Sequence, residues 1–240
     1  TQALGLHFIE FFSGHFPIAP DPAKASAMKA KLAKRDIAIS AHGVNSFTND
    51  HERNEVTFKF AKLAGIKNIS ANPKPNSFDS LDKLVAKYDI RIAIHNHGPG
   101  ALYDKISDVE DVVKDRHPLI GACVDTGHYL RSNEDPVDAI KRLGKRVFGV
   151  HLKDVKSYAT EADAAAFIKT GKARRQLKKE QKFFTLLGEG GLDVVGCLRR
   201  LRQLKYQNIV SLEYEENKDN PLSDIAICLE TVRKAVKELG

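Results

Sequence analysis

The stretch "IAIHNHGPG", residues 92–100, ends an apolar run in two imidazoles. Ile92, Ala93 and Ile94 are typical of a buried strand, and the Gly-Pro-Gly that follows predicts its end. His95 and His97 therefore stand at the carboxyl end of a predicted strand. Histidines in this position can simply cap a core. Whether they have a functional role depends on which residues stand at the ends of the other strands.

Six further runs have the same character, and segments of helical periodicity lie between them. The predicted strands cover residues 6–12, 37–43, 66–72, 91–97, 121–127, 147–153 and 209–215. The predicted helices cover residues 21–34, 52–64, 78–87, 107–115, 135–143, 193–204 and 222–238. This alternation predicts a parallel sheet with helical crossovers.

The alternation fits two α/β folds, a doubly wound sheet and a (β/α)8 TIM barrel. No glycine-rich phosphate loop follows an early strand, so a nucleotide-binding sheet has no support. We predict the TIM barrel, as a single domain over residues 1–240. Because only seven strand–helix units are visible, we expect the first unit to be lacking or truncated. Residues 157–185 fit no unit and are predicted to be an irregular insertion, either a lid or a disordered loop.

The net charge of +7 comes largely from residues 169–182, which hold seven Lys or Arg against one Glu. We interpret this run as a solvated helix face, because nucleic-acid binding usually adds interleaved aromatic residues and the chain has no Trp. The three cysteines form no CxxC pair and are expected to be small buried hydrophobes. No apolar run reaches the ~20 residues of a membrane span. We expect a cytoplasmic location, although a removed signal peptide would leave no trace.

Ionisable side chains stand at the carboxyl ends of most predicted strands. They are Glu10, His42, His95, His97, Asp125, His128, His151 and Glu213. In a parallel barrel these ends open on one face, where active sites of barrels are built. Filling a core with such groups would cost about 1–3 kcal/mol for each unpaired one. A divalent cation would remove that cost, and mixed imidazole and carboxylate ligands suit Mn, Co, Zn, Mg or Fe.

Four motifs carry a family resemblance: "VDTGH" (124–128), "VHLKD" (150–154), "LGEGGLD" (187–193) and "SLEYE" (211–215). In this order they resemble the sugar phosphate isomerase/epimerase superfamily of xylose-isomerase-like TIM barrels. The resemblance runs from Leu6 to the C-terminal helix. It implies a metal-dependent isomerase or epimerase of carbohydrate metabolism that acts through an enediolate on a sugar or keto-sugar.

The resemblance also implies a ligand set for one divalent metal ion, which could be Mn, Co, Mg or Zn. The positions that match the family's Glu, Asp, His and Glu are His95, Asp125, His151 and Glu213. His95 departs from the pattern, because the common "ENH" reads "HNH" here. This departure puts a two-carboxylate epimerase mechanism in doubt and favours an isomerase or a lyase.

Further roles follow from the motifs. Glu213, His97 and Lys153 are the candidate catalytic groups. Lys153 lies two residues after His151, so it could neutralise an enediolate or simply pair with Asp154 or Glu213. The candidate substrate-binding residues are His128, His42, Glu10 and Glu189.

The alternative function is a metal-dependent lyase or dehydratase of keto-sugars or inososes. An endonuclease-IV-type DNA repair enzyme is less expected, because it needs further ligands and no His occurs between residues 155 and 187. An inactive binding barrel is the third alternative. The expected partner is a small sugar, with neither nucleic acid nor membrane, and a homo-oligomer is left open.

Overall fold

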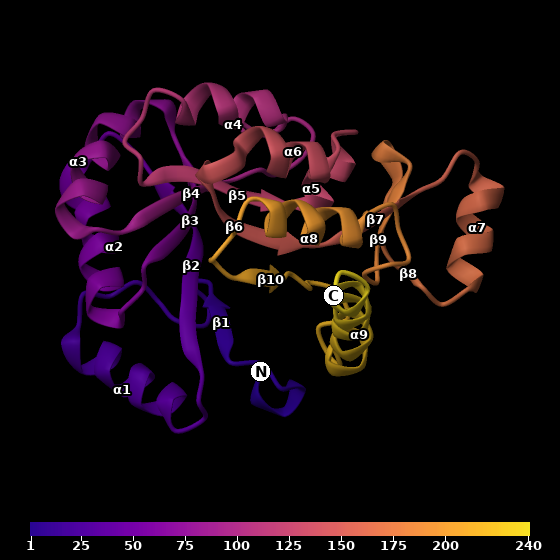
Figure 1. Ribbon diagram of the computed structural model, residues 1–240, viewed down its shortest axis with the longest axis horizontal. Coiled ribbons are helices and arrows are strands. Elements are labelled where there is room, and N and C mark those ends of the chain that lie inside the picture. Colours follow the sequence, from indigo (N-terminus) through magenta and orange to yellow (C-terminus); the bar gives the residue numbers. More distant parts are fainter. The chain divides into compact units, whose positions relative to one another are not determined.

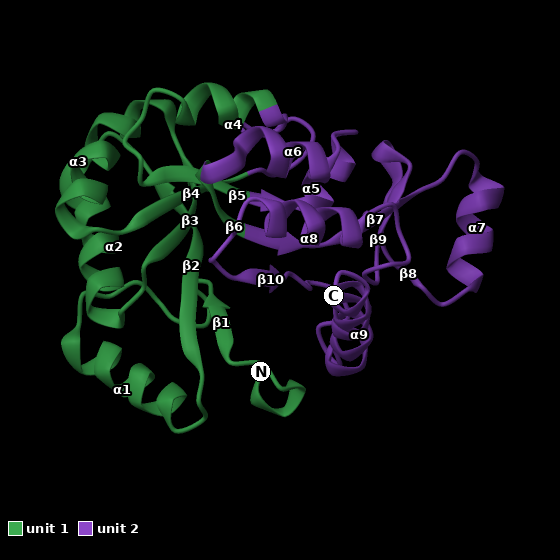
Figure 2. Cartoon of the chain, viewed as in Figure 1, with its two compact units in different colours: residues 1–95, 107–123, 146–149 green, residues 96–106, 124–145, 150–240 purple.

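The computed structural model describes residues Thr1–Gly240, which form two compact units. Unit 1 comprises residues 1–95, 107–123 and 146–149, and unit 2 comprises residues 96–106, 124–145 and 150–240 (Figure 2). The expectation of a single domain over 1–240 stays a prediction. No helix has the length and apolar character needed to cross a membrane.

Unit 1 is built on neighbouring parallel strands (Figure 1). They are β1 (Phe8–Phe11), β2 (Ala38–Phe47), β3 (Asn68–Pro73), β4 (Arg91–His95) and the first part of β5 (Ile120–Asp125). The helices of this region are α1 (Pro22–Ala33), α2 (His51–Ala64), α3 (Phe78–Tyr88) and α4 (Ile106–Val113), with the short 3-10 helices η1 (Gln2–Leu4) and η2 (Pro75–Ser77). The 3-10 helix η3 (Gly144–Arg146) begins in unit 2 and ends in unit 1.

Helix α3 shows why these segments fold as they do. Leu81, Leu84 and Val85 recur at spacings of three and four and are fully buried, which gives the helix one apolar face. Asp89 ends the helix in the left-handed conformation, and its backbone N–H donates to Val85 O. The strands bury both faces, as expected for a sheet with helical crossovers, since Ile92, Ala93 and Ile94 are all fully buried.

The parallel sheet continues through β6 (Val147–Leu152) to β10 (Val210–Leu212), in the order β1-β2-β3-β4-β5-β6-β10. Its remaining helices are α5 (Thr126–Arg131), α6 (Pro136–Leu143), α8 (Val194–Gln203) and α9 (Leu222–Glu238). The seven predicted strands and seven predicted helices are thus confirmed, and the fold is an α/β TIM barrel with seven parallel strands. Only the short α5 among these helices was not predicted.

The prediction of an irregular insertion at 157–185 is wrong. Unit 2 folds this region into a three-stranded antiparallel sheet in the order β7-β9-β8, together with α7 (Glu161–Lys169). The strands are β7 (Asp154–Ser157), β8 (Ala173–Leu177) and β9 (Lys182–Thr185), with η4 (Lys178–Glu180) between the last two. Tyr158, Ala164 and Phe183 form its small core, and Figure 1 shows α7 on the outer side of this sheet. We call residues 154–187 the folded insertion.

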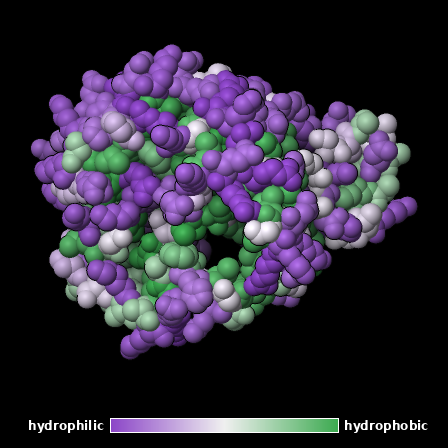
Figure 3. Space-filling view, in the orientation of Figure 1, coloured by the Kyte–Doolittle hydropathy of each residue, from purple (hydrophilic) through white to green (hydrophobic).

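The interpretation of residues 169–182 as a solvated helix face is also wrong, because most of this run forms β8, η4 and the start of β9. Several of its cations are used inside unit 2. Arg174 makes two hydrogen bonds to Asp224, and Arg175 donates to Glu216. Elsewhere hydrophilic residues predominate on the surface in view, with hydrophobic residues visible in the gaps between them (Figure 3).

Candidate metal centre

Three strand ends bring ionisable side chains together in unit 2. Asp125 is the last residue of β5, His151 lies near the end of β6, and Glu213 directly follows β10. Parallel pairing sets Ser211 opposite His151, so Glu213 lies two residues beyond that partner. Asp125 and His151 are buried, whereas the Glu213 side chain is partly exposed. The prediction that these strand ends converge is borne out for this trio.

Lys153 lies at the centre of this group. Its Nζ atom donates to Glu213 Oε1 at 2.6 Å and to Glu215 Oε2 at 3.2 Å, and lies 3.6 Å from Asp125 Oδ2. Burial acts to lower the pKa of Lys153, but the negative charges of Asp125, Glu213 and Glu215 outweigh it and raise that pKa. The side chain is therefore an ammonium ion at neutral pH, and it pairs with Glu213 rather than Asp154.

The donor atoms fit a divalent cation. One ligand atom from each of His95, Asp125, His151 and Glu213 lies within 4.8 Å of the others. Two imidazole nitrogens and two carboxylate oxygens form a set that suits Zn, Mn, Co or Fe in an open coordination sphere. His151 Nδ1 already contacts Glu213 Oε2 at 2.5 Å. This set matches the four predicted ligands, whose role as metal ligands remains a proposal.

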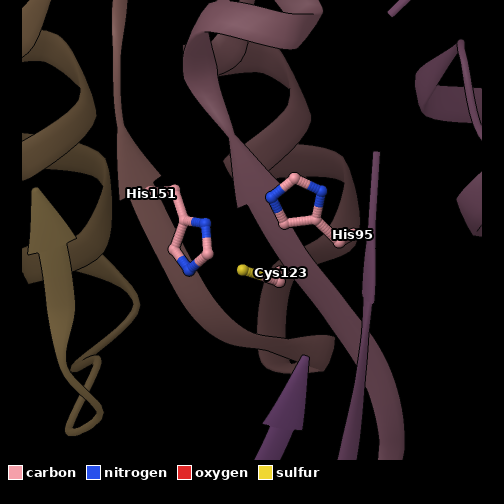
Figure 4. A group of neighbouring side chains, drawn as sticks. All are labelled: His95, Cys123 and His151. Atoms are coloured by element: carbon pink, nitrogen blue, oxygen red, sulfur yellow. The ribbon is translucent and has the colours of Figure 1, made fainter. Parts of the chain in front are cut away.

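Figure 4 shows Cys123 beside His95 and His151. The ligand atoms of these three side chains also lie within 4.8 Å of one another. Cys123 precedes Asp125 by two residues in β5, so the two side chains point to the same side of the sheet. All three cysteines are buried, as the sequence predicted, and none forms a disulfide.

Two polar residues that the sequence analysis did not single out hold the end of β5. Asn96 Nδ2 donates to Asp125 O, and Asn96 Oδ1 accepts from Asp125 N, both at 2.9 Å. Thr126 Oγ1 accepts from Lys153 N at 2.9 Å and lies 2.7 Å from Lys153 O. Asn96 lies between the two histidines of "HNH", which was the one signal available for it in the sequence.

Two further histidines stand next to this group. The rings of His97 and His128 have centroids 5.5 Å apart. His128 N donates to Asp125 Oδ1 at 2.7 Å, so Asp125 caps α5, and His128 Nε2 lies 3.9 Å from Asp125 Oδ2. Arg131, which no sequence motif indicated, donates to His128 Nδ1 at 2.9 Å and to His97 O at 3.2 Å.

The other candidate substrate-binding residues have local partners. In unit 1, His42 Nε2 lies 2.9 Å from Phe16 O, and Asn45 Nδ2 approaches the other ring nitrogen. Burial lowers the pKa of His42, so this imidazole is neutral near pH 7. Glu10 accepts a hydrogen bond from Ser70 at 2.8 Å. In unit 2, Glu189 pairs with Lys172 at 2.6 Å. Their roles toward a substrate stay predictions.

The seven parallel strands and their crossover helices place the chain in the class of α/β TIM barrels. A sequence model described as "Xylose isomerase-like TIM barrel" matches residues 74–234, and the chain belongs to this family.

Three similar proteins illustrate the relationship. An inosose dehydratase from Clostridium botulinum is 28% identical over 154 residues, which cover 61% of this chain and 48% of the relative, so the chain spans about half the length of this curated relative. A solved structure of an uncharacterised protein from Parabacteroides distasonis has a TM-score of 0.67 at 27% identity and covers 98% of this chain and 90% of that one. The IolI protein with a bound zinc atom has a TM-score of 0.66 at 17% identity, covering 99% and 89%, and shows the shared fold.

Proposed function

We propose that this chain is a divalent-metal-dependent lyase that dehydrates a small polyhydroxylated ketone of the inosose type. The observation that carries the proposal is the buried Lys153 ammonium beside Asp125 and Glu213, next to a pair of imidazoles. The name of the inosose dehydratase relative favours elimination over isomerisation. The isomerase or epimerase expected first from the sequence remains the second candidate, because it begins with the same proton abstraction.

The reaction is redox-neutral. The C–H bond next to the carbonyl breaks, and its proton passes to a base on the protein. The electron pair forms a C=C bond as the C–O bond of the next carbon breaks. The hydroxyl group leaves with a proton from an acid on the protein, as water. A substrate therefore needs a ketone with a hydroxyl two carbons away, which every inosose has.

A divalent cation held by His95, Asp125, His151 and Glu213 would polarise the carbonyl and so acidify the neighbouring C–H bond. Lys153 supplies a second positive charge at the same place. Its ammonium group, which is held by Glu213 and Glu215, donates a hydrogen bond to the substrate oxygen on which negative charge develops.

His97 supplies the proton transfers, since an imidazole can accept a proton and then give it up. We assign proton removal to His97, whose imidazolium then gives that proton to the departing hydroxyl. His128 donates a hydrogen bond to the same hydroxyl from Nε2. This assignment leaves Glu213 as a metal ligand that also fixes Lys153 through their 2.6 Å contact.

The test is a panel of ketones, including an inosose and open-chain keto-sugars, incubated in D2O with Zn2+, Mn2+, Co2+ or Mg2+. We expect loss of one water by mass spectrometry and the ultraviolet absorption of a conjugated carbonyl product. A product that has lost no water but has exchanged a carbon-bound hydrogen for deuterium would establish the isomerase or epimerase instead. No turnover and no deuterium uptake with any metal would reject both.

Lys153→Met tests the role of the ammonium group. Removing one preorganised donor to a developing oxyanion costs about 10²–10³ in kcat, and we expect a loss in that range. Asp111→Asn serves as the control, since Asp111 is exposed and pairs only with Lys114 on the surface. Equal turnover by Lys153→Met and the control would exclude Lys153 from the reaction.

A further inference from the structure

The folded insertion is attached to α5, the short helix that carries His128. Lys182 of β9 donates from Nζ to Leu130 O and Arg131 O at 2.7 Å and to Asn133 Oδ1 at 2.8 Å. These backbone carbonyls lie at the C-terminal end of α5, where a cation is favourably placed. Lys182 is buried, so this contact fixes the helix end to the insertion.

A second contact joins the insertion to Arg131. Glu180 Oε2 accepts from Arg131 Nε at 2.9 Å, and Glu180 Oε1 accepts from Nη2 at 2.6 Å. Both side chains are less than one-fifth exposed, at 17% for Arg131 and 19% for Glu180. A bidentate pair of this kind fixes the plane of the guanidinium group as well as its position. Glu180 is the single acidic residue of the basic run at 169–182, and it is the residue that binds Arg131.

The fixed guanidinium group of Arg131 determines which ring nitrogen of His128 carries the proton. Arg131 Nη1 lies 2.9 Å from His128 Nδ1. A guanidinium group can only donate hydrogen bonds, so Nδ1 must be the acceptor. A neutral His128 then carries its proton on Nε2, which is the nitrogen that faces Asp125. Phe184 of β9 packs edge-on against the same imidazole, with ring centroids 6.3 Å apart.

We propose that the folded insertion is a positioning device that holds His128 as the Nε2–H tautomer through a Glu180–Arg131–His128 chain of hydrogen bonds. Arg131 and Glu180 are positioning residues, because they act through His128. The insertion thereby presents Nε2–H of one imidazole as a fixed hydrogen-bond donor at the site. The consequence for turnover rests on the proposed function, whereas the tautomer itself does not.

Nitrogen-15 NMR of histidine-labelled protein tests the tautomer directly, because protonated and unprotonated ring nitrogens differ strongly in chemical shift. The His128 signals are assigned by their loss in His128→Gln. In the wild-type chain we expect Nδ1 of His128 to be unprotonated and Nε2 to be protonated. In Arg131→Met we expect a mixture of the two tautomers. A wild-type proton on Nδ1, or an unchanged tautomer in Arg131→Met, would overturn the proposal.

Arg174→Met is the matched control. Arg174 also lies in the folded insertion and also makes two hydrogen bonds to one carboxylate, that of Asp224. It makes no hydrogen bond to His128, so its loss should weaken the packing of the insertion and leave the His128 tautomer as in the wild type. The same tautomer change in both variants would mean that the insertion acts only through general stability.

Glu180→Gln covers the case in which Arg131→Met does not fold. The amide keeps one acceptor for Arg131, so we expect a smaller tautomer shift in the same direction. Where dehydration is measurable, Arg131→Met should lower kcat at least about tenfold with little change in KM, as part of the ~10²-fold or more that one preorganised hydrogen-bond donor contributes. A tautomer shift without measurable dehydration would retain the positioning role and reject only the proposed function.

Discussion

Gly190 lies directly against Asp154, because a Cβ atom at position 190 would be 2.2 Å from Asp154 Oδ1. The buried carboxylate of Asp154 accepts hydrogen bonds from the backbone N–H groups of Val155, Gly188, Gly190 and Leu192, at 2.8 to 3.0 Å. Asp154 directly follows Lys153 in the chain. The motifs "VHLKD" and "LGEGGLD" are therefore joined by hydrogen bonds, because the carboxylate of Asp154 in the first accepts from backbone N–H groups of the second.

Asp154→Ala should strongly destabilise the chain. It leaves the buried backbone donors of Val155 and Leu192 without their acceptor, and each such donor costs about 1–3 kcal/mol. We expect the free energy of unfolding to fall by roughly 3 kcal/mol or more, measured by urea denaturation. Asp111→Ala, at an exposed position, should change it by less than about 0.5 kcal/mol. Similar small effects for both variants would show that the loop at 188–192 does not depend on this carboxylate.

The positions of the strands and helices were predictable because burial imposes a local pattern. Ile92, Ala93 and Ile94 are fully buried, and so are Leu81, Leu84 and Val85 at helical spacing. The convergence of Asp125, His151 and Glu213 was predictable as well, since parallel strands bring their carboxyl ends to one edge. In these cases the tertiary structure follows from local sequence patterns, namely the spacing of apolar residues and the positions of the strand ends.

The folded insertion was not predictable in this way. Strand β8, with the sequence "ARRQL", lacks an apolar alternation, and its extended state depends on antiparallel pairing with β9. The contact between Arg131 and Glu180 joins residues 49 positions apart. It forms because the insertion folds back on α5. No short sequence motif predicts a contact between residues so far apart in the chain. The run was interpreted from its many basic residues, so its one acidic residue, Glu180, was not singled out.

Asp125→Ala and His151→Ala should each abolish retention of a divalent cation. Each removes one of the four donors that lie within 4.8 Å of one another, and three ligands hold a cation less tightly than four. The measurement is metal content by mass spectrometry after loading with Zn2+ or Mn2+ and dialysis. Unchanged metal content in both variants would remove the candidate metal centre.

Asp193→Ala controls for the loss of a helix cap in Asp125→Ala. Asp193 caps α8 by accepting from Gly196 N at 2.7 Å, as Asp125 caps α5 by accepting from His128 N. Both substitutions should lower stability by about 1 kcal/mol through the lost cap. Only Asp125→Ala should also lose the metal, which separates a ligand role from a structural one.

His95→Glu should keep the metal. A carboxylate is a competent ligand for the same divalent cations. The family that the sequence resembles commonly has Glu where this chain has His95. His95→Ala, in contrast, should weaken retention, since it removes the donor altogether. Metal content is measured as above for both variants. Loss of metal in His95→Glu would mean that the imidazole has a role that a carboxylate cannot fill.

Asp224→Asn should make stability less dependent on pH. The two hydrogen bonds from Arg174 lower the pKa of Asp224 below its ordinary value of 3.8, so its stabilising effect is complete above that value and is lost as the pH falls through the folded-state pKa. We expect the substitution to cost about 2 kcal/mol near pH 7 and much less near pH 3, by urea denaturation. Asp79→Asn, which removes an exposed partner of Arg116, should cost less than about 0.5 kcal/mol at both pH values. An equal cost of Asp224→Asn at both pH values would mean that the carboxylate charge does not stabilise the fold.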